Sequence, residues 1–334
     1  MSSSEKETGN SQTNGIVVLD GGMGHELKRT GGVKISGERG SLPRFLGVAM
    51  ANVQQPEAVV NAHLAFMDAG CDVITTNSYS VVPRVFELCT SQRNDKEDGE
   101  MTLESLLTAA CENACSARDR RPDKRVLVAG SLPPLAESYR PDCVGPYEQN
   151  LSSYRRIIKV IAPYCDVLLC ETMSTVSEAK AACVAASEIN NKLPVWVSFT
   201  LDEFKPVLRS GETLHEAVEA LADIGDDCIQ AYLVNCTSPE SVTLAIPILN
   251  SLLEDKRQAA GNGCSPIMIG GYANGFATST DAKDEYRDIS ETEYYDFVSK
   301  WIDSGATAVG GCCGIFPPHI AYIRKRLDEM SNNK

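Results

Sequence analysis

The stretch ATAVGGCCG, residues 306–314, decides the fold, because it is a short apolar segment that stops at glycines and then presents two thiols. Small and β-branched apolar residues without charge are typical of a buried strand. Thiols at the carboxyl end of such a strand are soft metal ligands. The pattern therefore predicts that Cys312 and Cys313 serve a site and do not merely fill the core.

A second stretch, CIQAYLVNC at residues 228–236, has the same pattern and closes on Asn235 and Cys236. The residues that follow it, Thr237 to Pro239, are typical of a helix start. Three cysteines at the ends of two strands predict a zinc site with three thiolate ligands and a fourth position open for water or substrate. An open fourth position is typical of catalytic zinc. The predicted ligands are Cys236, Cys312 and Cys313.

Other interpretations of these thiols remain. A structural zinc site would need a fourth cysteine, and the sequence contains no CxxC pair to supply it. A disulfide between Cys312 and Cys313 would strain the backbone, and a reducing compartment disfavours it. The non-enzymatic alternative is a zinc-storage or redox-sensing protein whose thiols respond to oxidation.

Composition limits the class of protein. The net charge of -14 over 334 residues argues against nucleic acid and anionic membranes as partners, because both select basic surfaces. No apolar run approaches the roughly 20 residues of a membrane-spanning helix. Thirteen cysteines without an apolar signal segment predict a reducing compartment, and hence a cytoplasmic protein. Residues 1–14 are polar and are predicted to be a disordered tail.

Strands and helices alternate along the rest of the chain. Apolar strands are expected at residues 16–19, 71–76, 125–129, 166–170, 194–201, 228–236, 266–270 and 306–309. Helices are expected at residues 55–70, 103–118, 147–164, 177–189, 211–225, 238–253, 291–305 and 318–329. Eight such units without a composition break predict a single α/β domain, a (β/α)8 or TIM barrel, over residues 15–330.

A barrel enzyme works at the carboxyl ends of its strands. The residues at such ends are Asp20, Thr76, Glu171, Asn235, Cys236, Cys312 and Cys313. The run DGGMG at residues 20–24 is either a plain turn or a place where a carboxylate receives an ammonium group. Glu171 follows an apolar strand, so it either caps the next helix or holds a substrate ammonium group.

Several common enzyme motifs are absent. The sequence contains no GxSxG, no GxxxxGK[ST] and no GxGxxG at a first strand-to-helix junction, which weakens the case for a hydrolase, a nucleotidase or a dehydrogenase, and its histidines show no HExxH spacing. Most of the other cysteines lie in helical or strand patterns, where a thiol behaves as a small apolar side chain. The three thiols at the strand ends therefore remain the main candidates for chemistry.

Four motifs together resemble the zinc-dependent homocysteine S-methyltransferase family: DGGMG at 20–24, CET at 170–172, NC at 235–236 and GGCCG at 310–314. The resemblance runs from about Ile16 to about Leu327. It implies the same barrel, a Zn2+ ion on the three strand-end cysteines, and homocysteine as the fourth ligand. It further implies that Asp20, Gly21, Thr76 and Glu171 hold the amino-acid end of homocysteine, and that Asn235 supports the site.

The resemblance also implies transfer of a methyl group from a positively charged donor to the homocysteine sulfur, giving methionine. Members that use S-methylmethionine or S-adenosylmethionine are compact like this chain, whereas betaine-dependent members have tyrosine where Thr172 stands here. The loops FLGVAM at 45–50 and YANGF at 272–276 depart from the usual donor-side patterns. The donor therefore stays open between a sulfonium compound and betaine or another onium compound, and the sequence gives no oligomeric state.

Overall fold

The computed structural model describes residues 15–31, 42–90, 101–188, 193–224, 228–254, 267–275 and 289–332. The expected disordered tail, residues 1–14, lies outside these ranges. Phe276, the last residue of the stretch YANGF, also lies outside them.

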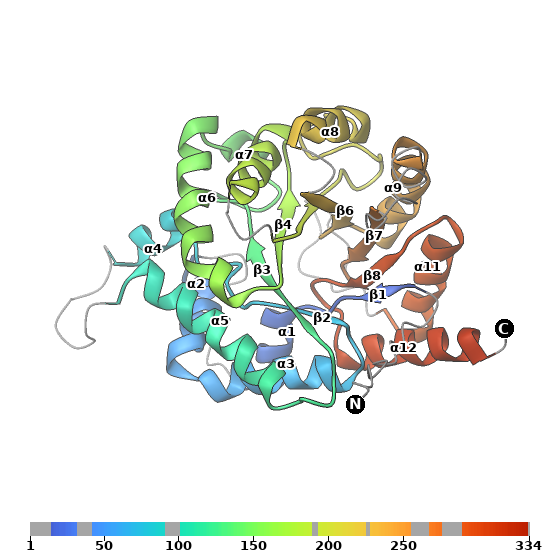
Figure 1. Ribbon diagram of the computed structural model, residues 1–334, viewed down its shortest axis with the longest axis horizontal. Coiled ribbons are helices and arrows are strands. Elements are labelled where there is room, and N and C mark those ends of the chain that lie inside the picture. The colour runs from blue at the N-terminus through green and yellow to red at the C-terminus, as the bar shows by residue number, and fades with distance from the viewer. Residues whose placement is uncertain are drawn as a thin grey trace, which may run out of the picture.

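The described strands form one parallel sheet that curls into a barrel, with the helices around it (Figure 1). The strands of these ranges are β1 (Val17–Val18), β2 (Val73–Thr75), β3 (Leu127–Leu132), β4 (Val167–Met173), β5 (Val195–Phe199), β6 (Ile229–Asn235), β7 (Met268–Ala273) and β8 (Ala308–Gly311). Their order is β1-β8-β7-β6-β5-β4-β3-β2, and a parallel bridge between Leu19 and Val73 joins its two ends. The predicted (β/α)8 barrel is confirmed.

The helices surround the sheet as the alternating pattern predicts (Figure 1). They are α1 (Met23–Arg29), α2 (Leu42–Gln54), α3 (Pro56–Asp68), α4 (Pro83–Thr90), α5 (Leu103–Asp119), α6 (Tyr147–Ile161), α7 (Val176–Ser187), α8 (Leu214–Leu221), α9 (Pro239–Leu252), α11 (Glu291–Asp303) and α12 (Pro317–Asn332). No element was expected at α1, α2 or α4. Several helices begin where a hydroxyl accepts an early backbone N–H, as Thr175, Thr213 and Ser238 do.

The barrel interior is packed with side chains, so it is not a pore. One cluster fills it and includes Trp196, Leu169 and Tyr272, while a larger cluster lies between the strands and the helices. A filled interior leaves the loops at the carboxyl ends of the strands as the place for a site.

The opposite end of the barrel is tied together by the last helix. Arg324 of α12 donates to the carbonyl of Gly70 at 2.8 Å and to the carboxylate of Asp72 at 2.5 Å. The same carboxylate accepts from the backbone N–H of Val18 at 2.8 Å. The chain's end therefore stabilises the pairing of β1 and β2. Within the described ranges, no helix combines the length and apolar character needed to cross a membrane.

Candidate metal and substrate site

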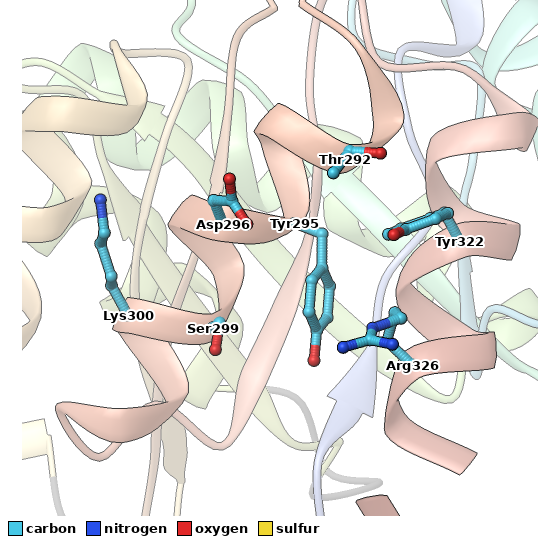
Figure 2. Close-up of a pocket in the computed structure, with 7 residues that line it drawn as sticks. All are labelled: Thr292, Tyr295, Asp296, Ser299, Lys300, Tyr322 and Arg326. Atoms are coloured by element: carbon cyan, nitrogen blue, oxygen red, sulfur yellow. The ribbon is translucent and has the colours of Figure 1, made fainter. Parts of the chain in front are cut away.

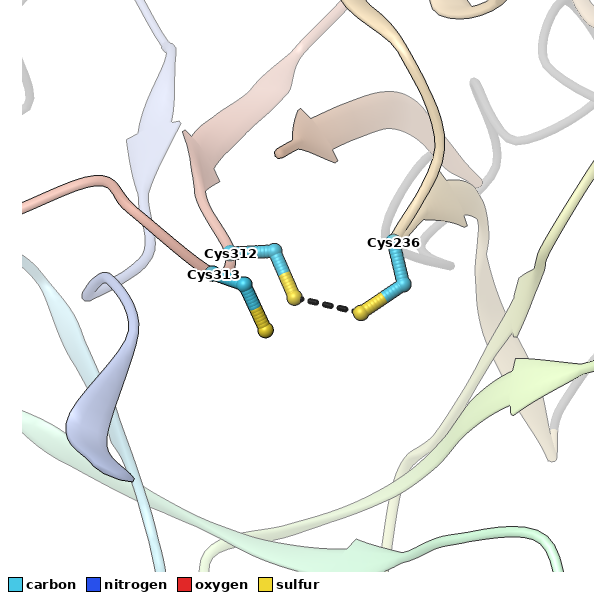
Figure 3. A group of neighbouring side chains, drawn as sticks. All are labelled: Cys236, Cys312 and Cys313. Atoms are coloured by element: carbon cyan, nitrogen blue, oxygen red, sulfur yellow. Dashed lines mark hydrogen bonds between the residues drawn. The ribbon is translucent and has the colours of Figure 1, made fainter. Parts of the chain in front are cut away.

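Three thiols meet at the carboxyl ends of β6 and β8 (Figure 3). The Sγ atoms of Cys236, Cys312 and Cys313 all lie within 4.8 Å of one another, and those of Cys236 and Cys312 are 2.6 Å apart. Cys236 is buried, whereas Cys312 and Cys313 are half-buried. The cluster is therefore anchored in the barrel on one side and accessible on the other.

The three thiols differ in pKa. Thiol groups of Cys312 and Cys313 hydrogen-bond to Cys236 and hold its pKa well below the usual range. The same contacts, together with burial, raise the pKa values of Cys312 and Cys313. One thiolate with two thiol donors is a ready arrangement for a soft cation.

The donor set fits zinc. Tetrahedral zinc with sulfur ligands at about 2.3 Å sets neighbouring sulfurs about 3.8 Å apart. The pair at 2.6 Å therefore has to separate by about 1 Å when it binds the ion, a change that side-chain rotation can supply. Three cysteine ligands, two of them half-buried, match the protein ligands of a catalytic zinc site.

An unusual backbone positions Cys236. Among the described residues, positive φ values outside glycine occur at Tyr139 (65°), Thr172 (59°) and Cys236 (50°). Such conformations cost about 1 to 3 kcal/mol each, and surrounding contacts have to maintain them. Asn235 does so here: its Oδ1 accepts from the Thr172 N–H at 2.9 Å and from the Ser198 hydroxyl at 2.7 Å, and its Nδ2 donates to the Thr172 hydroxyl at 2.9 Å.

Asp20 lies at the end of β1 and is buried. Its two carboxylate oxygens accept from Thr75, one from the backbone N–H at 2.7 Å and one from the hydroxyl at 3.0 Å. Burial outweighs these hydrogen bonds and raises the pKa of Asp20 to about 7. A cation that binds here restores the charged form.

Glu171 lies inside β4, whereas the sequence had suggested that it follows the strand. The register between β4 and β5 shifts between Cys170 and Met173, so the strand is irregular at Glu171. The hydroxyl of Ser131 donates to one carboxylate oxygen at 2.5 Å. Burial still raises the pKa of Glu171 to about 8, and Asp20 adds to the rise, so the two carboxyls share one electrostatic environment.

Two glycines bring the β1 loop against the cysteine pair. A Cβ at Gly21 would lie 2.4 Å from the carbonyl oxygen of Ile315, and a Cβ at Gly22 would lie 2.7 Å from the carbonyl oxygen of Cys312. Neither position accepts a side chain without backbone movement. The DGG motif therefore supplies close approach between the Asp20 turn and the Cys312 turn.

Comparison with known proteins bears on this arrangement. The family model "Homocysteine S-methyltransferase" matches residues 17–327. The chain belongs to the homocysteine S-methyltransferase family.

Individual members of the homocysteine S-methyltransferase family align over nearly the whole chain. Homocysteine S-methyltransferase 2 of Arabidopsis thaliana is 28% identical, with 95% of this chain and 94% of that protein covered. Selenocysteine Se-methyltransferase of Brassica oleracea var. italica is also 28% identical, with 95% and 90% covered. The metallated form of the Escherichia coli homocysteine methyltransferase MmuM has the same fold, with a TM-score of 0.73 at 24% identity over 93% of this chain and 96% of that one.

In this homocysteine S-methyltransferase family member, Thr76 forms its side-chain hydrogen bonds with Ser131 and Ser78 and not with Asp20 or Glu171. Its hydroxyl oxygen accepts from the Ser131 N–H at 3.0 Å and pairs with the Ser78 hydroxyl at 2.9 Å. Its neighbour Thr75 contacts Asp20 instead. Thr75 and Ser131 are polar residues of the site that sequence reasoning missed, and their position inside apolar strands was the available signal.

Three tyrosines that the sequence analysis did not select also surround the thiols. The Tyr139 hydroxyl lies near Cys236 and helps to lower its pKa, and the Tyr79 hydroxyl contacts Ser138 at 2.7 Å. Tyr272 of β7 is buried, and its hydroxyl has no hydrogen-bond partner. Burial raises the pKa values of all three phenols, so they stay neutral, and the faces of their rings can attract a cation.

A separate cavity of about 510 Å³ lies on the outside of the barrel between α11 and α12 (Figure 2). Tyr295 and Tyr322 meet edge to face across it, with ring centroids 5.8 Å apart, and the Arg326 guanidinium lies over the Tyr295 ring. None of the residues that line it belongs to the site at the strand ends.

Proposed function

We propose that this protein transfers a methyl group from a sulfonium donor, S-methylmethionine or S-adenosylmethionine, to the thiolate of L-homocysteine bound to Zn2+, forming methionine. The observation that carries the proposal is the convergence of three thiols within 4.8 Å at the mouth of a barrel that belongs to this family. The ligands are Cys236, Cys312 and Cys313, and their chemistry requires a reducing compartment such as the cytoplasm.

Zinc would supply deprotonation of the acceptor thiol. A free thiol with a pKa near 8.5 is only about 3% ionised at pH 7, which handicaps attack by roughly 2 kcal/mol. A coordinating thiol loses its proton outright, and three further thiolates keep its sulfur electron-rich. The chain then needs no histidine as general base.

The protein's own residues would hold the amino-acid end of homocysteine. Asp20 and Glu171 offer carboxylates to its ammonium group, and the cation would lower both raised pKa values. Gly21 lets the β1 turn lie close to the substrate, and Thr76 positions Ser131, which in turn binds Glu171. Asn235 keeps the Cys236 turn in its strained conformation.

The transfer step is balanced without another reactant. A new bond forms between the homocysteine sulfur and the methyl carbon, while the bond from that carbon to the donor sulfur breaks and leaves its electron pair on the donor sulfur. The donor becomes a neutral thioether, and the only proton released is the one lost earlier by the homocysteine thiol. Alignment of the two sulfurs can contribute about 7 to 11 kcal/mol relative to free encounter.

A sulfonium donor suits the residues around the thiols. Thr172 is buried and hydrogen-bonded to Asn235, so the position holds no exposed aromatic side chain of the kind found in betaine-dependent members. Tyr79, Tyr139 and Tyr272 offer ring faces to a cation, and the thiolates and carboxylates add negative charge.

The test is methionine formation by the zinc-loaded protein with homocysteine and one donor at a time. We expect turnover with S-methylmethionine or S-adenosylmethionine and little with betaine. Turnover with betaine alone would overturn the donor assignment. Absence of methionine with every donor, while zinc stays bound at one equivalent, would favour the metal-binding alternative.

A further inference from the structure

Arg209 is a cation without a counterion at the edge of the site. It lies between β5 and α8, in a segment folded by antiparallel bridges from Leu201 to Leu208 and from Val207 to Thr213. Its backbone N–H donates to the carbonyl of Thr200 at 3.3 Å. The hydroxyl of Thr200 donates to the carbonyl of Cys236 at 3.0 Å. Thr200 thus links the backbone of Arg209 to the backbone of Cys236 through two hydrogen bonds.

Its guanidinium group is only partly satisfied. The Nε and Nη2 atoms are buried and make no hydrogen bond, and within the described residues no carboxylate pairs with them. A buried charged donor without a partner is unfavourable, whereas the planar guanidinium fork matches a carboxylate with two parallel hydrogen bonds. The geometry of Arg209 is that of a receptor for a carboxylate.

The ring of Tyr139 lies between this guanidinium and the thiols. The Arg209 Cζ atom is 5.0 Å from the ring centroid, and the hydroxyl at the other end of Tyr139 lies near Cys236. Tyr139 holds a positive φ of 65°, a conformation that a non-glycine residue adopts at a cost. One aromatic ring therefore separates a free cation from the predicted metal ligands.

We infer that Arg209 binds the carboxylate of an amino-acid-type sulfonium donor and so selects donors that carry this group. The inference rests on the proposed function. In S-methylmethionine the sulfonium and the carboxylate lie at opposite ends of a short chain. The Tyr139 ring could lie alongside that chain, with the methyl group toward the thiols and the carboxylate on Arg209.

The carboxylate of homocysteine is a less suitable partner for Arg209. Its carboxylate and ammonium groups share one carbon, so both must stay near Asp20, which follows β1, and Glu171, which lies inside β4. Arg209 instead approaches from the loop that follows β5, with the Tyr139 loop beside it. A ligand bound to Arg209 therefore enters from the side of the β5 and Tyr139 loops, where the methyl donor has to bind.

Charge balance supports the same assignment. Three thiolates around Zn2+, with the homocysteine thiolate as a fourth, would leave the floor of the site negatively charged, which attracts the sulfonium and the ammonium group of the donor but repels its carboxylate. Arg209 offsets that repulsion only at the end of the site where the donor carboxylate would bind. The site thus becomes complementary to a zwitterionic donor and discriminates against a purely cationic one.

The experiment compares zinc-loaded wild type with Arg209→Met, using S-methylmethionine and its decarboxylated analogue, (3-aminopropyl)dimethylsulfonium. We expect the variant to raise KM for S-methylmethionine roughly 10- to 100-fold, with KM for homocysteine within about twofold of wild type. The two proteins should use the decarboxylated analogue equally well. Arg209→Lys, which keeps the charge but loses the fork, should recover part of the affinity.

Arg140→Met is the matched control, because Arg140 is the exposed neighbour of Tyr139 and pairs with Asp142. It should leave both KM values unchanged. A rise in KM for homocysteine, an equal loss with both donors, or no change in Arg209→Met would each overturn the inference.

Calorimetric titration of S-methylmethionine into the same proteins separates this inference from the proposed function. Weaker binding of S-methylmethionine by Arg209→Met than by wild type would support the inference. If wild type then formed no methionine, only the proposed function would be rejected. Equal binding by the two proteins, or no binding by wild type, would overturn the inference.

Discussion

The side-chain amide of Asn235 holds Thr172 with two hydrogen bonds of 2.9 Å, and so joins the end of β6 to the irregular end of β4. Thr172 is adjacent to Glu171, and Asn235 is adjacent to Cys236. The predicted ammonium-binding residue and a predicted metal ligand are therefore held by one side chain.

Replacement of Asn235 should damage both stability and metal binding. Asn235→Ala leaves the Thr172 N–H and the Ser198 hydroxyl buried without a partner, so we expect a loss of about 2 to 4 kcal/mol in the free energy of unfolding. Zinc affinity should fall as well, because the Cys236 turn loses its support. Urea unfolding and zinc titration measure the two effects. Ser198→Ala, which removes one of the three hydrogen bonds, should cost about 1 kcal/mol; equal effects of the two variants would contradict the argument.

Gly22 should be intolerant of a methyl group, and Gly24 provides the control. In Gly22→Ala the new Cβ would lie 2.7 Å from the Cys312 carbonyl oxygen, so the cysteine turn has to shift. In Gly24→Ala it would lie 3.5 Å from Val48, an ordinary contact, and α1 would gain helix propensity. We expect Gly22→Ala to weaken zinc binding at least tenfold and Gly24→Ala to leave it unchanged. Competition with a chromogenic chelator gives both affinities, and indistinguishable values would refute this account of the glycine.

Cys312→Ala should remove the metal while the barrel stays folded. The variant loses one of three thiolates and creates only a small cavity at a half-buried position. We expect bound zinc to fall from one equivalent to less than a tenth, with methyl transfer abolished and the far-UV circular dichroism unchanged. Cys143→Ser, which alters a half-buried thiol in a different loop, serves as control. Full transfer activity in Cys312→Ala would rule out the proposed metal site.

The sequence was sufficient to locate the thiols, because an apolar run that ends in glycine and cysteine is visible in one dimension. The barrel then brings distant strand ends to one mouth, so the convergence of Cys236 with Cys312 followed from the fold. The described strands form the one predicted barrel, whereas the boundaries 15 and 330 and the disordered tail stay predictions.

The sequence could not predict contacts that depend on strand register and loop conformation. Successive strand residues point to opposite faces, so a one-residue difference decides that Thr75, and not Thr76, binds Asp20. The irregularity at Glu171 depends on how β4 pairs with β5. Tyr139 and Arg209 meet only through the packing of two loops, which no local pattern indicates.

Glu171→Gln should weaken homocysteine binding without removing zinc. The amide keeps the shape of the carboxyl group but cannot pair with an ammonium ion, a loss of about 1.5 to 3 kcal/mol, so KM for homocysteine should rise roughly 10- to 100-fold. The control is Glu178→Gln, because Glu178 is also a buried carboxyl group but contacts Leu135 and Tyr154 outside the site. Steady-state kinetics and zinc content of both variants check the prediction. An unchanged KM in Glu171→Gln would remove this residue from the substrate site.

His63 makes the stability of the protein depend on pH. It is fully buried in α3, neither ring nitrogen has a hydrogen-bond partner, and burial lowers its pKa to about 3. The unfolded chain binds a proton on this residue below about pH 6.5, whereas the folded protein does not until about pH 3. Neutral His63 therefore makes its full contribution to the free energy of unfolding above pH 6.5. This contribution is lost as the pH falls toward 3, and the loss is about 2 kcal/mol at pH 5.

Substitution of His63 by leucine should remove this part of the pH dependence, because leucine fills a similar volume and binds no proton. Urea unfolding of the metal-free protein at pH 7 and pH 5 isolates the effect, since zinc binding itself depends on pH. We expect His63→Leu to lose about 2 kcal/mol less than wild type between the two values. His215→Leu, at an exposed position of α8, should lose as much as wild type does. Equal losses of stability in wild type and His63→Leu would contradict this prediction. They would mean that the ring of His63 takes up a proton in the folded protein despite its burial in α3.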